Sequence, residues 1–298
     1  MTPPLLFDRT LHRKRLDRAA PRYAGFLKAR AAEDAAWRLS AILRSFPLAV
    51  DLGSRDGAFG AALRAVEGAD RVGTLIEADL SPAMLRGRPG LRVVADEERL
   101  PFRDESLDLV VSLLSLHWTN DLVGALVQIR RTLKPDGLFI GAFLGGATLA
   151  ELRQSLLEAE EEVTGGAGPR VSPFADALDA AGLLQRAGFA LPVSDIDRVT
   201  VRYDHPLKLM ADLRAMGETN VLLDRSRRPL SRRVLSRAFE IYRERFADKD
   251  GRLPASFEIV SATGWAPHPD QQKPLRPGSA KASLAEALGA VERPLPRE

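Results

Sequence analysis

The sequence predicts an α/β fold built on a doubly wound, mostly parallel sheet, and three observations favour it. Short apolar runs of strand length alternate with amphipathic stretches of helical spacing between residues 46 and 143. A turn containing two glycines, Asp51-Leu-Gly-Ser-Arg-Asp-Gly57, follows the first of these runs and precedes a helix. The chain has 298 residues, 45% of them hydrophobic, so it can bury a full core without disulfides. Together these features indicate repeated βαβ units.

In the first half of the chain we expect five strands with helices between them. The strands are 48–52, 71–77, 91–95, 107–112 and 138–143. The helices are 29–46, ended by Pro47, then 58–66, a short one opened by Ser81 as its N-cap, and 122–133, which a turn at 134–137 follows.

The second half predicts two further strands, which complete a seven-stranded sheet, and a helical lid. Helices are expected at 148–163, 175–187, 207–216 and 232–246, and strands at 194–203 and 254–263. The segment of about 204–250 falls between these two strands, which favours a lid. The predicted parts are an N-terminal helical cap at 1–45, a ligand-binding core at 46–145, the rest of the sheet with its lid at 146–265, and a flexible tail at 266–298.

Composition and charge exclude several functions. Lys and Arg number 43 against 40 Asp and Glu, so the net charge of +3 favours no bulk binding of nucleic acid. The chain has no Cys, and its four His form no metal-binding pattern, so we expect no metal site. The longest uncharged apolar stretch, Gly137–Ala150, is too short to span a membrane. Because no secretory signal is visible and acids interrupt the arginine-rich start, we expect a cytoplasmic protein.

Groups that can contact a bound ligand lie at the ends of three successive strands. The glycine turn follows the first strand and lets backbone approach a ligand. Asp79 ends the second strand and can accept hydrogen bonds from a ribose diol. Asp96 ends the third and can accept from the exocyclic amine of adenine. Because the carboxyl ends of parallel strands meet at one edge of a sheet, these groups point to one nucleoside-like ligand.

Four motifs, in order, resemble the class I S-adenosylmethionine (SAM)-dependent methyltransferases. They are D-L-G…G, A-D-L-S-P-A-M-L, A-D-x-x-x-L-P-F-x-D-x-x-L-D-L-V-V-S and L-K-P-D-G-L-F-I, and they cover about residues 46–143. The resemblance implies a Rossmann-like fold, SAM as the cofactor, and cofactor contacts from Asp51, Gly53, Ser54, Gly57, Asp79, Leu80, Asp96, Glu97 and Ser112. A dehydrogenase would show G-x-G-x-x-G, which this turn lacks.

One position departs from that family. The usual turn is G-x-G-x-G, and its middle glycine is Arg55 here. The missing side chain normally lets the backbone lie against the ligand. We therefore expect Arg55 to point away, to contact a ligand carboxylate, or to weaken binding.

A narrower similarity extends along the whole chain. The segments that carry it include Phe7-Asp-Arg9, Leu116-His-Trp-Thr-Asn-Asp121, Gly145-Gly-Ala-Thr-Leu149, Met216-Gly-Glu-Thr-Asn220 and Ala262-Thr-Gly-Trp265. Together they resemble the complex I assembly factor 5 group and, less closely, the malonyl-acyl-carrier-protein methyltransferases of biotin synthesis. The first resemblance implies hydroxylation of an arginine in a complex I subunit. A complex I subunit or an acyl carrier protein is the protein partner that these groups imply.

The candidate catalytic residues are His117, Trp118 and Glu218. His117 can act as a general base and Trp118 can wall the cofactor, although both can instead pack beneath a ligand. Glu218, in the predicted lid, can face the guanidinium of a substrate arginine, and Glu151 is the alternative.

Three other polar segments have structural interpretations. Asn120-Asp121 is expected to cap a helix. The acidic run Glu158–Glu162 is expected to be a solvated helix face. The basic segment Arg225–Arg233 is expected to be a solvated loop, or else a docking site for an acidic partner.

The leading hypothesis is a SAM-dependent methyltransferase that acts on a small-molecule or protein acceptor. One alternative is a complex I assembly factor that hydroxylates an arginine, and another is a non-catalytic assembly chaperone that binds SAM. The chain has no Cys, so it cannot hold a thiolate or iron–sulfur site, and hydroxylation would need another source of oxidising power. For this reason methyl transfer is the first of the three hypotheses.

Overall fold

A computed structural model of the chain describes residues 5–172 and 180–271, together with residues 279 and 289. The chain divides into two units, Met1–Pro267 and His268–Glu298. The first unit contains the sheet and all the helices described below. The predicted boundaries of cap, core, lid and tail stay predictions.

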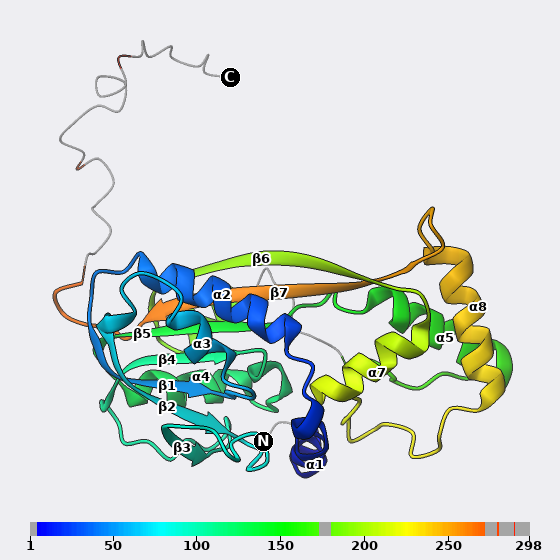
Figure 1. Cartoon of the computed structure of the whole chain (residues 1–298), viewed down its shortest axis with the longest axis horizontal. Helices are drawn as coiled ribbons and strands as arrows, with labels where there is room; N and C mark the ends of the chain where they lie inside the picture. The colour runs from blue at the N-terminus through cyan, green and yellow to red at the C-terminus, as the bar shows by residue number, and fades with distance from the viewer. Residues whose placement is uncertain (1–4, 173–179, 272–278, 280–288, 290–298) are drawn as a thin grey trace. The chain divides into compact units, whose positions relative to one another are not determined.

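The predicted seven-stranded sheet is confirmed, with the strand order β3-β2-β1-β4-β5-β7-β6 (Figure 1). Its strands are β1 Phe46–Leu52, β2 Val72–Asp79, β3 Leu91–Val94, β4 Leu107–Leu113, β5 Leu133–Leu144, β6 Ala190–Tyr203 and β7 Leu253–Trp265. The first five strands pair in parallel, and β7 pairs antiparallel with both β5 and β6. The carboxyl ends of β1, β2, β3 and β4 therefore meet at one edge, as a ligand site in this fold requires.

Helices cover both faces of the sheet. They are α1 Arg9–Ala19, α2 Phe26–Ser40, α3 Ala58–Leu63, α4 Leu122–Thr132, α5 Ala150–Thr164, α6 Ala180–Arg186, α7 Pro206–Met216 and α8 Arg232–Phe246. Alternate residues of β1 enter different cores: Ala49 packs with α2 and α3, and Val50 packs with α4 and α6. Because successive strand residues point to opposite faces, a run of apolar residues is needed where both faces are covered.

The predicted lid segment connects the two longest strands, β6 and β7. β6 pairs with β7 as far as Tyr203 and Leu253, whereas β5 pairs with β7 only from Ile259 onward. The β6–β7 ribbon thus extends past the rest of the sheet, and α5, α7 and α8 gather beside that extension (Figure 1).

The acidic run at the end of α5 is only in part the solvated face that was expected, with Glu161 and Glu162 exposed. Glu160 is buried and pairs with Arg170. Glu158 pairs with Arg245 of α8, and Glu162 pairs with Arg237 of α8. The acids hold α8 against α5, a long-range pairing that the local pattern does not reveal.

The structure differs from three predictions of local structure. The helix predicted to run to residue 46 ends at Ser40, because the Arg71 guanidinium binds the free carbonyls of Ser40 and Ile42 at 3.0 and 2.8 Å. The segment after Ser81 forms turns instead of a helix, since its backbone bonds span three residues and Gly87 has a φ of 73°. The turn predicted at 134–137 is a bulge within β5.

The helix predicted at 175–187 is confirmed as α6 from residue 180, and residues 175–179 lie outside the described residues. Among the described residues, we found no helix with the length and apolar character needed to cross a membrane.

Candidate functional site

The glycine turn begins where β1 ends, and it lies against β2 and the loop after β4. Gly53 and Gly57 have φ angles of 74° and 71°, in the left-handed region that side chains rarely adopt. A Cβ atom on Gly53 would collide with the hydroxyl of Ser115. The backbone N–H groups of Gly53 and Ser54 donate to the carbonyl of Ala78 at 2.7 and 3.0 Å, which ties the turn to β2.

Arg55 points into the site, which excludes the first of the three alternatives expected for it, that it points away. Its side chain is 1% exposed. Its backbone φ of 52° lies in a region that is unfavourable for residues other than glycine. Its Nη1 and its backbone N donate to Oδ2 of Asp79 at 2.8 and 2.9 Å, and its Nη2 donates to Oγ of Ser115 at 3.3 Å. Although burial works against it, Asp79 raises the pKa of Arg55, so this guanidinium is charged.

A second arginine holds the acids that follow β3. Nη2 of Arg9 donates to Oδ1 of Asp96 at 2.6 Å and also to Oε2 of Glu97. Nη1 of Arg9 donates to the carbonyl of Trp118 at 3.2 Å, and Ser115 donates to the other oxygen of Glu97. Burial opposes ionisation of Glu97, but the guanidinium groups of Arg9 and Arg55 lower the pKa of this carboxyl.

The two arginines occupy the positions that ligand donors would take. Asp79 is the acid assigned to a ribose diol, and Asp96 and Glu97 are the acids assigned to adenine. Each of these carboxylates already accepts N–H donors from the chain. The acids therefore suit an adenosine, whose hydroxyl and amine groups are donors of the same kind. A ligand that uses these acids competes with both guanidinium groups for the carboxylate oxygens.

Lys28 and Asp51 are both buried near the turn, and each affects the pKa of the other. Nζ of Lys28 donates to the carbonyls of Gly53 and Leu113, each at 2.6 Å, and so joins the ends of β1 and β4. Burial lowers the pKa of Lys28. Burial also raises the pKa of Asp51 to about 6, against the opposing effect of Lys28.

Several buried polar atoms of the site have no hydrogen-bond partner among the described residues. They are both carboxylate oxygens of Asp51, the hydroxyl of Ser54 and both ring nitrogens of His12. Burial and the charges of Arg55 and Arg9 hold the pKa of His12 well below its usual range, so this ring is neutral. Buried polar groups are nearly always paired in native proteins, so these atoms fit a polar ligand such as SAM.

Glu218 contacts the adjacent residues His117 and Trp118, which precede it by 101 and 100 residues in the chain. Nε1 of Trp118 donates to Oε2 of Glu218 at 2.9 Å and to Oε1 at 3.1 Å. Nε2 of His117 lies 3.1 Å from Oε2 of the same carboxylate. Trp118 is buried against Phe7 and His12, with ring centroids 5.2 and 4.9 Å away.

The loop after Trp118 also fixes the N-terminal segment. Oδ1 of Asn120 accepts from the backbone N–H groups of Leu6 and Phe7, both at 2.7 Å, which places Arg9 over the site. The predicted helix cap is confirmed at Asp121, whose carboxylate accepts from N–H of Gly124 at 2.8 Å.

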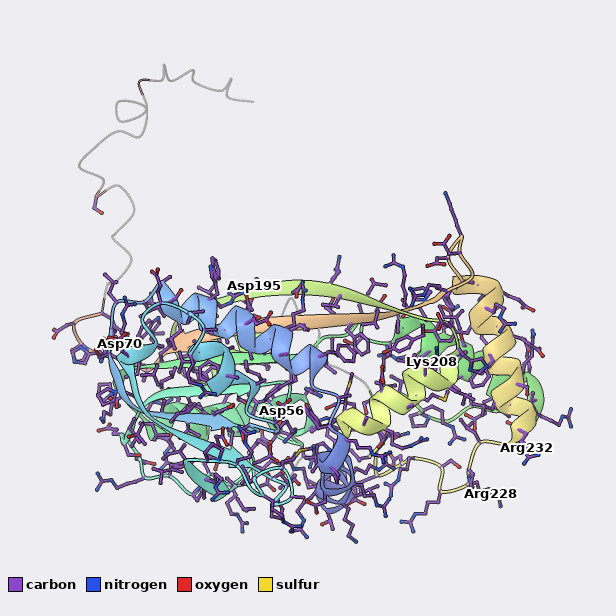
Figure 2. The ribbon with its side chains drawn as sticks, in the orientation of Figure 1. Asp56, Asp70, Asp195, Lys208, Arg228 and Arg232 are labelled. Carbon is purple, nitrogen blue, oxygen red and sulfur yellow. The ribbon has the colours of Figure 1, made fainter. Side chains whose placement is uncertain are left out.

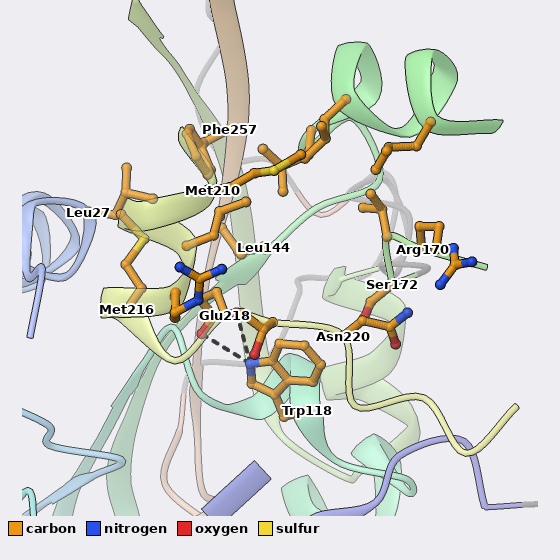
Figure 3. Close-up of a pocket in the computed structure, with 17 residues that line it drawn as sticks. Leu27, Trp118, Leu144, Arg170, Ser172, Met210, Met216, Glu218, Asn220 and Phe257 are labelled. Atoms are coloured by element: carbon orange, nitrogen blue, oxygen red, sulfur yellow. Dashed lines mark hydrogen bonds between the residues drawn. The ribbon is translucent and has the colours of Figure 1, made fainter. Parts of the chain in front are cut away.

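A pocket of about 220 Å³ opens beside Trp118 (Figure 3). Most of its wall is apolar, with side chains from α2, β5, α5, α7 and β7. Its polar lining residues are Arg170, Ser172, Arg214, Glu218, Thr219 and Asn220. Figure 3 shows Glu218 hydrogen-bonded to the indole of Trp118 at one end of this apolar space.

Other residues assigned to the site have structural partners. The hydroxyl of Ser112 donates to the carbonyl of Leu52 at 3.0 Å, within the sheet. Leu80 packs in a small apolar cluster with Leu16 of α1. The carboxylate of Glu151 binds the backbone N–H and the hydroxyl of Ser256 and does not line the pocket, so the alternative that gave it the role of Glu218 is disfavoured.

Sequence comparison now decides the family. Residues 50–141 match the methyltransferase domain family. The mitochondrial arginine-hydroxylase NDUFAF5 of Homo sapiens is 42% identical over 98% of this chain and 85% of its own length. The malonyl-[acyl-carrier protein] O-methyltransferase of Laribacter hongkongensis is 35% identical over 90% of this chain and 92% of its own length.

The chain belongs to the class I SAM-dependent methyltransferase superfamily. Its cofactor is S-adenosyl-L-methionine. A solved structure of a Bacillus halodurans protein assigned to the methyltransferases has the same fold, with a TM-score of 0.54 and 15% identity over 79% of this chain and 99% of that chain. The class I methyltransferase fold expected from the sequence is therefore confirmed.

The first prediction concerns Arg55. In an Arg55→Gly variant, SAM no longer has to break the buried ion pair with Asp79, so we expect its affinity to rise by about 10- to 100-fold. The ligand-free variant should be less stable, because Asp79 then lacks its buried counter-charge. Calorimetric titration and thermal unfolding measure these two effects. Arg86→Gly, at an exposed position of the turn that follows β2, is the matched control. Equal or weaker SAM affinity in Arg55→Gly would show that Arg55 contributes to ligand binding.

The second prediction concerns Asp51. Because its pKa rises from 3.8 to about 6 on folding, its protonated form stabilises the fold below pH 4, and that contribution disappears as the pH rises through 6. We expect the difference in free energy of unfolding, wild type minus Asp51→Asn, to fall by about 2 kcal/mol between pH 4 and pH 7. Urea unfolding at several pH values measures it, with the exposed Asp56→Asn as the control. A difference that stays constant with pH would contradict the assigned titration.

Proposed function

We propose that this chain binds SAM and modifies an arginine side chain of a protein substrate, as a hydroxylase in the assembly of respiratory complex I. The observation that carries the proposal is the pocket beside Trp118, whose apolar wall leads to the carboxylate of Glu218. A site of this shape suits a side chain that is apolar along its length and cationic at its tip.

Arginine has that character: three methylene groups can pack on apolar walls while the guanidinium meets a carboxylate. Trp118 and His117 engage the oxygens of Glu218 at distances of 2.9–3.1 Å. A carboxylate has about four acceptor positions, so it can also accept from a guanidinium. The indole thus orients Glu218, and the chain positions the substrate arginine beside the nucleoside site.

The relatives support the same substrate. NDUFAF5 proteins of Danio rerio and Homo sapiens, named arginine hydroxylases, are 41% and 42% identical over nearly the whole chain. Bound SAM supplies a sulfonium whose methyl group is electrophilic. Hydroxylation instead inserts an oxygen atom, so dioxygen and a reductant have to be supplied.

Methyl transfer to a carboxylate is the second candidate. Arg170 and Arg214 also line the pocket, and Arg214 is in no ion pair described in the structure. A free guanidinium there suits a malonyl group, the substrate that the malonyl-[acyl-carrier protein] O-methyltransferase relatives name. In that reaction the chain would act chiefly by positioning donor and acceptor.

The third prediction tests the arginine substrate. The protein is incubated with SAM, air, a reductant and a candidate complex I subunit, and the subunit is then analysed by mass spectrometry with fragmentation. We expect one added oxygen on an arginine. Glu218→Gln should lower the rate by about 10- to 100-fold, because it removes the charge that faces the guanidinium. SAM affinity should be unchanged.

Glu161→Gln, on the exposed surface of α5, is the matched control and should leave the rate unchanged. A methylene added to a carboxylate of malonyl-acyl-carrier protein would support the second candidate and contradict the first. An unmodified subunit, with SAM bound, would favour a non-catalytic assembly chaperone.

A further inference from the structure

A cleft lined by four arginines lies between α1 and α7. Its volume is about 620 Å³, nearly three times the 220 Å³ of the pocket beside Trp118. Arg15 and Arg18 come from α1, Arg22 from the turn that follows it, and Arg214 from α7. We call this site the arginine cleft.

The four guanidinium groups lack acidic partners within the part of the chain that the structure describes. No described ion pair includes any of them, whereas nearby Arg225 lies 3.7 Å from Asp8. Partial burial and the charges of Arg225 and Arg18 lower the pKa of Arg15, so like charges are crowded here. A bound anion would relieve the repulsion within a cluster of this kind.

The walls of the cleft are held together by close packing. Leu16 of α1 lies so near Gly217, at the end of α7, that a Cβ atom on Gly217 would contact its side chain at 2.7 Å. The backbone N–H of Ala24 donates to the carbonyl of Ala215 at 3.3 Å. These contacts fix the backbones of α1 and α7 on the two sides of the cleft.

The cleft and the pocket beside Trp118 share two lining residues, Arg214 and Thr219. The pocket has room for one side chain, and the cleft has room for more. A peptide that places a side chain in the pocket therefore brings its neighbouring residues to the cleft.

We propose that the arginine cleft binds an acidic segment of the protein substrate, adjacent in sequence to the residue that enters the pocket. This inference rests on the proposed function, since it takes the substrate to be a protein. Guanidinium groups bind carboxylates through paired N–H donors, so side chains of Asp or Glu match the four arginines. Because the cleft and the pocket share Arg214 and Thr219, acidic residues bound in the cleft determine which substrate arginine enters the pocket.

The fourth prediction tests this docking site by fluorescence anisotropy. The probe is a short fluorescein-labelled peptide with a single arginine flanked by glutamates, and its affinity for the full chain is measured with SAM present. We expect the double variant Arg15→Glu with Arg18→Glu to weaken binding by about 100-fold, because two attractive contacts become repulsive. A peptide with Gln in place of each Glu should bind wild type weakly and should be insensitive to the double variant.

The matched control reverses two charges on the exposed loop before α8, Arg227→Glu with Arg228→Glu; Figure 2 labels Arg228 on that loop. It should keep the affinity of wild type. Calorimetric measurement of SAM affinity checks that each variant is folded. A second double variant, Arg22→Glu with Arg214→Glu, tests the other two arginines of the cleft.

Failure of this inference is distinguishable from failure of the proposed function. If the peptide's Arg can be replaced by Gln without loss while its Glu residues still matter, the cleft is supported and the arginine pocket is contradicted. If the peptide does not bind, if its Glu residues do not matter, or if the loop variant weakens binding equally, the cleft proposal is overturned. The proposal is also overturned if the double variant binds the peptide as tightly as wild type does but no longer binds phosphatidylcholine vesicles that contain phosphatidylserine. That result would show that the cleft contacts membranes.

Discussion

The buried ion pair between Arg55 and Asp79 is the interaction on which the organisation of the site depends. It joins the glycine turn after β1 to the end of β2, and through Ser115 it reaches the loop after β4. Removing one partner of a buried pair typically costs about 3–5 kcal/mol, because the other charge is left unpaired in a medium of low dielectric. The pair therefore holds three strand ends together when no ligand does so.

The same pair sets a condition on the cofactor. The acceptors that the sequence assigns to SAM lie at the ends of β2 and β3, where Arg55 and Arg9 already bind them. We therefore expect binding to be an exchange of donors, in which ligand groups replace guanidinium groups. Because Arg9 begins α1, that exchange is coupled to the N-terminal helix, which also forms one wall of the arginine cleft.

Much of the sheet was predictable because strand and helix periodicities are local properties of the chain. The order of motifs predicted the nucleoside edge, where Asp79, Asp96 and the glycine turn lie. Contacts between distant segments were not predictable in this way. Lys28 stands within an apolar helical stripe, and a buried lysine there is a signal that would have pointed to the site. Arg9 lies in the segment Phe7-Asp-Arg9, which sequence similarity singled out without suggesting a role.

The direction of the Arg55 side chain could not be predicted from the sequence. The replacement of glycine was visible, but the direction of the side chain depends on Asp79 and Ser115, which are 24 and 60 residues away. The pairing of Glu218 with Trp118 likewise depends on how the lid folds over the core. The predicted cytoplasmic location and the roles of individual site residues stay predictions.

A crystal structure with bound S-adenosylhomocysteine would show which donors the acids of the site accept. We expect ribose hydroxyls on Asp79, and the Arg55 guanidinium moved from its 2.8 Å contact. We also expect Arg9 to have left Asp96 and Glu97. A complex in which the ligand is bound while Arg55 still holds Asp79 would show that the donors are not exchanged.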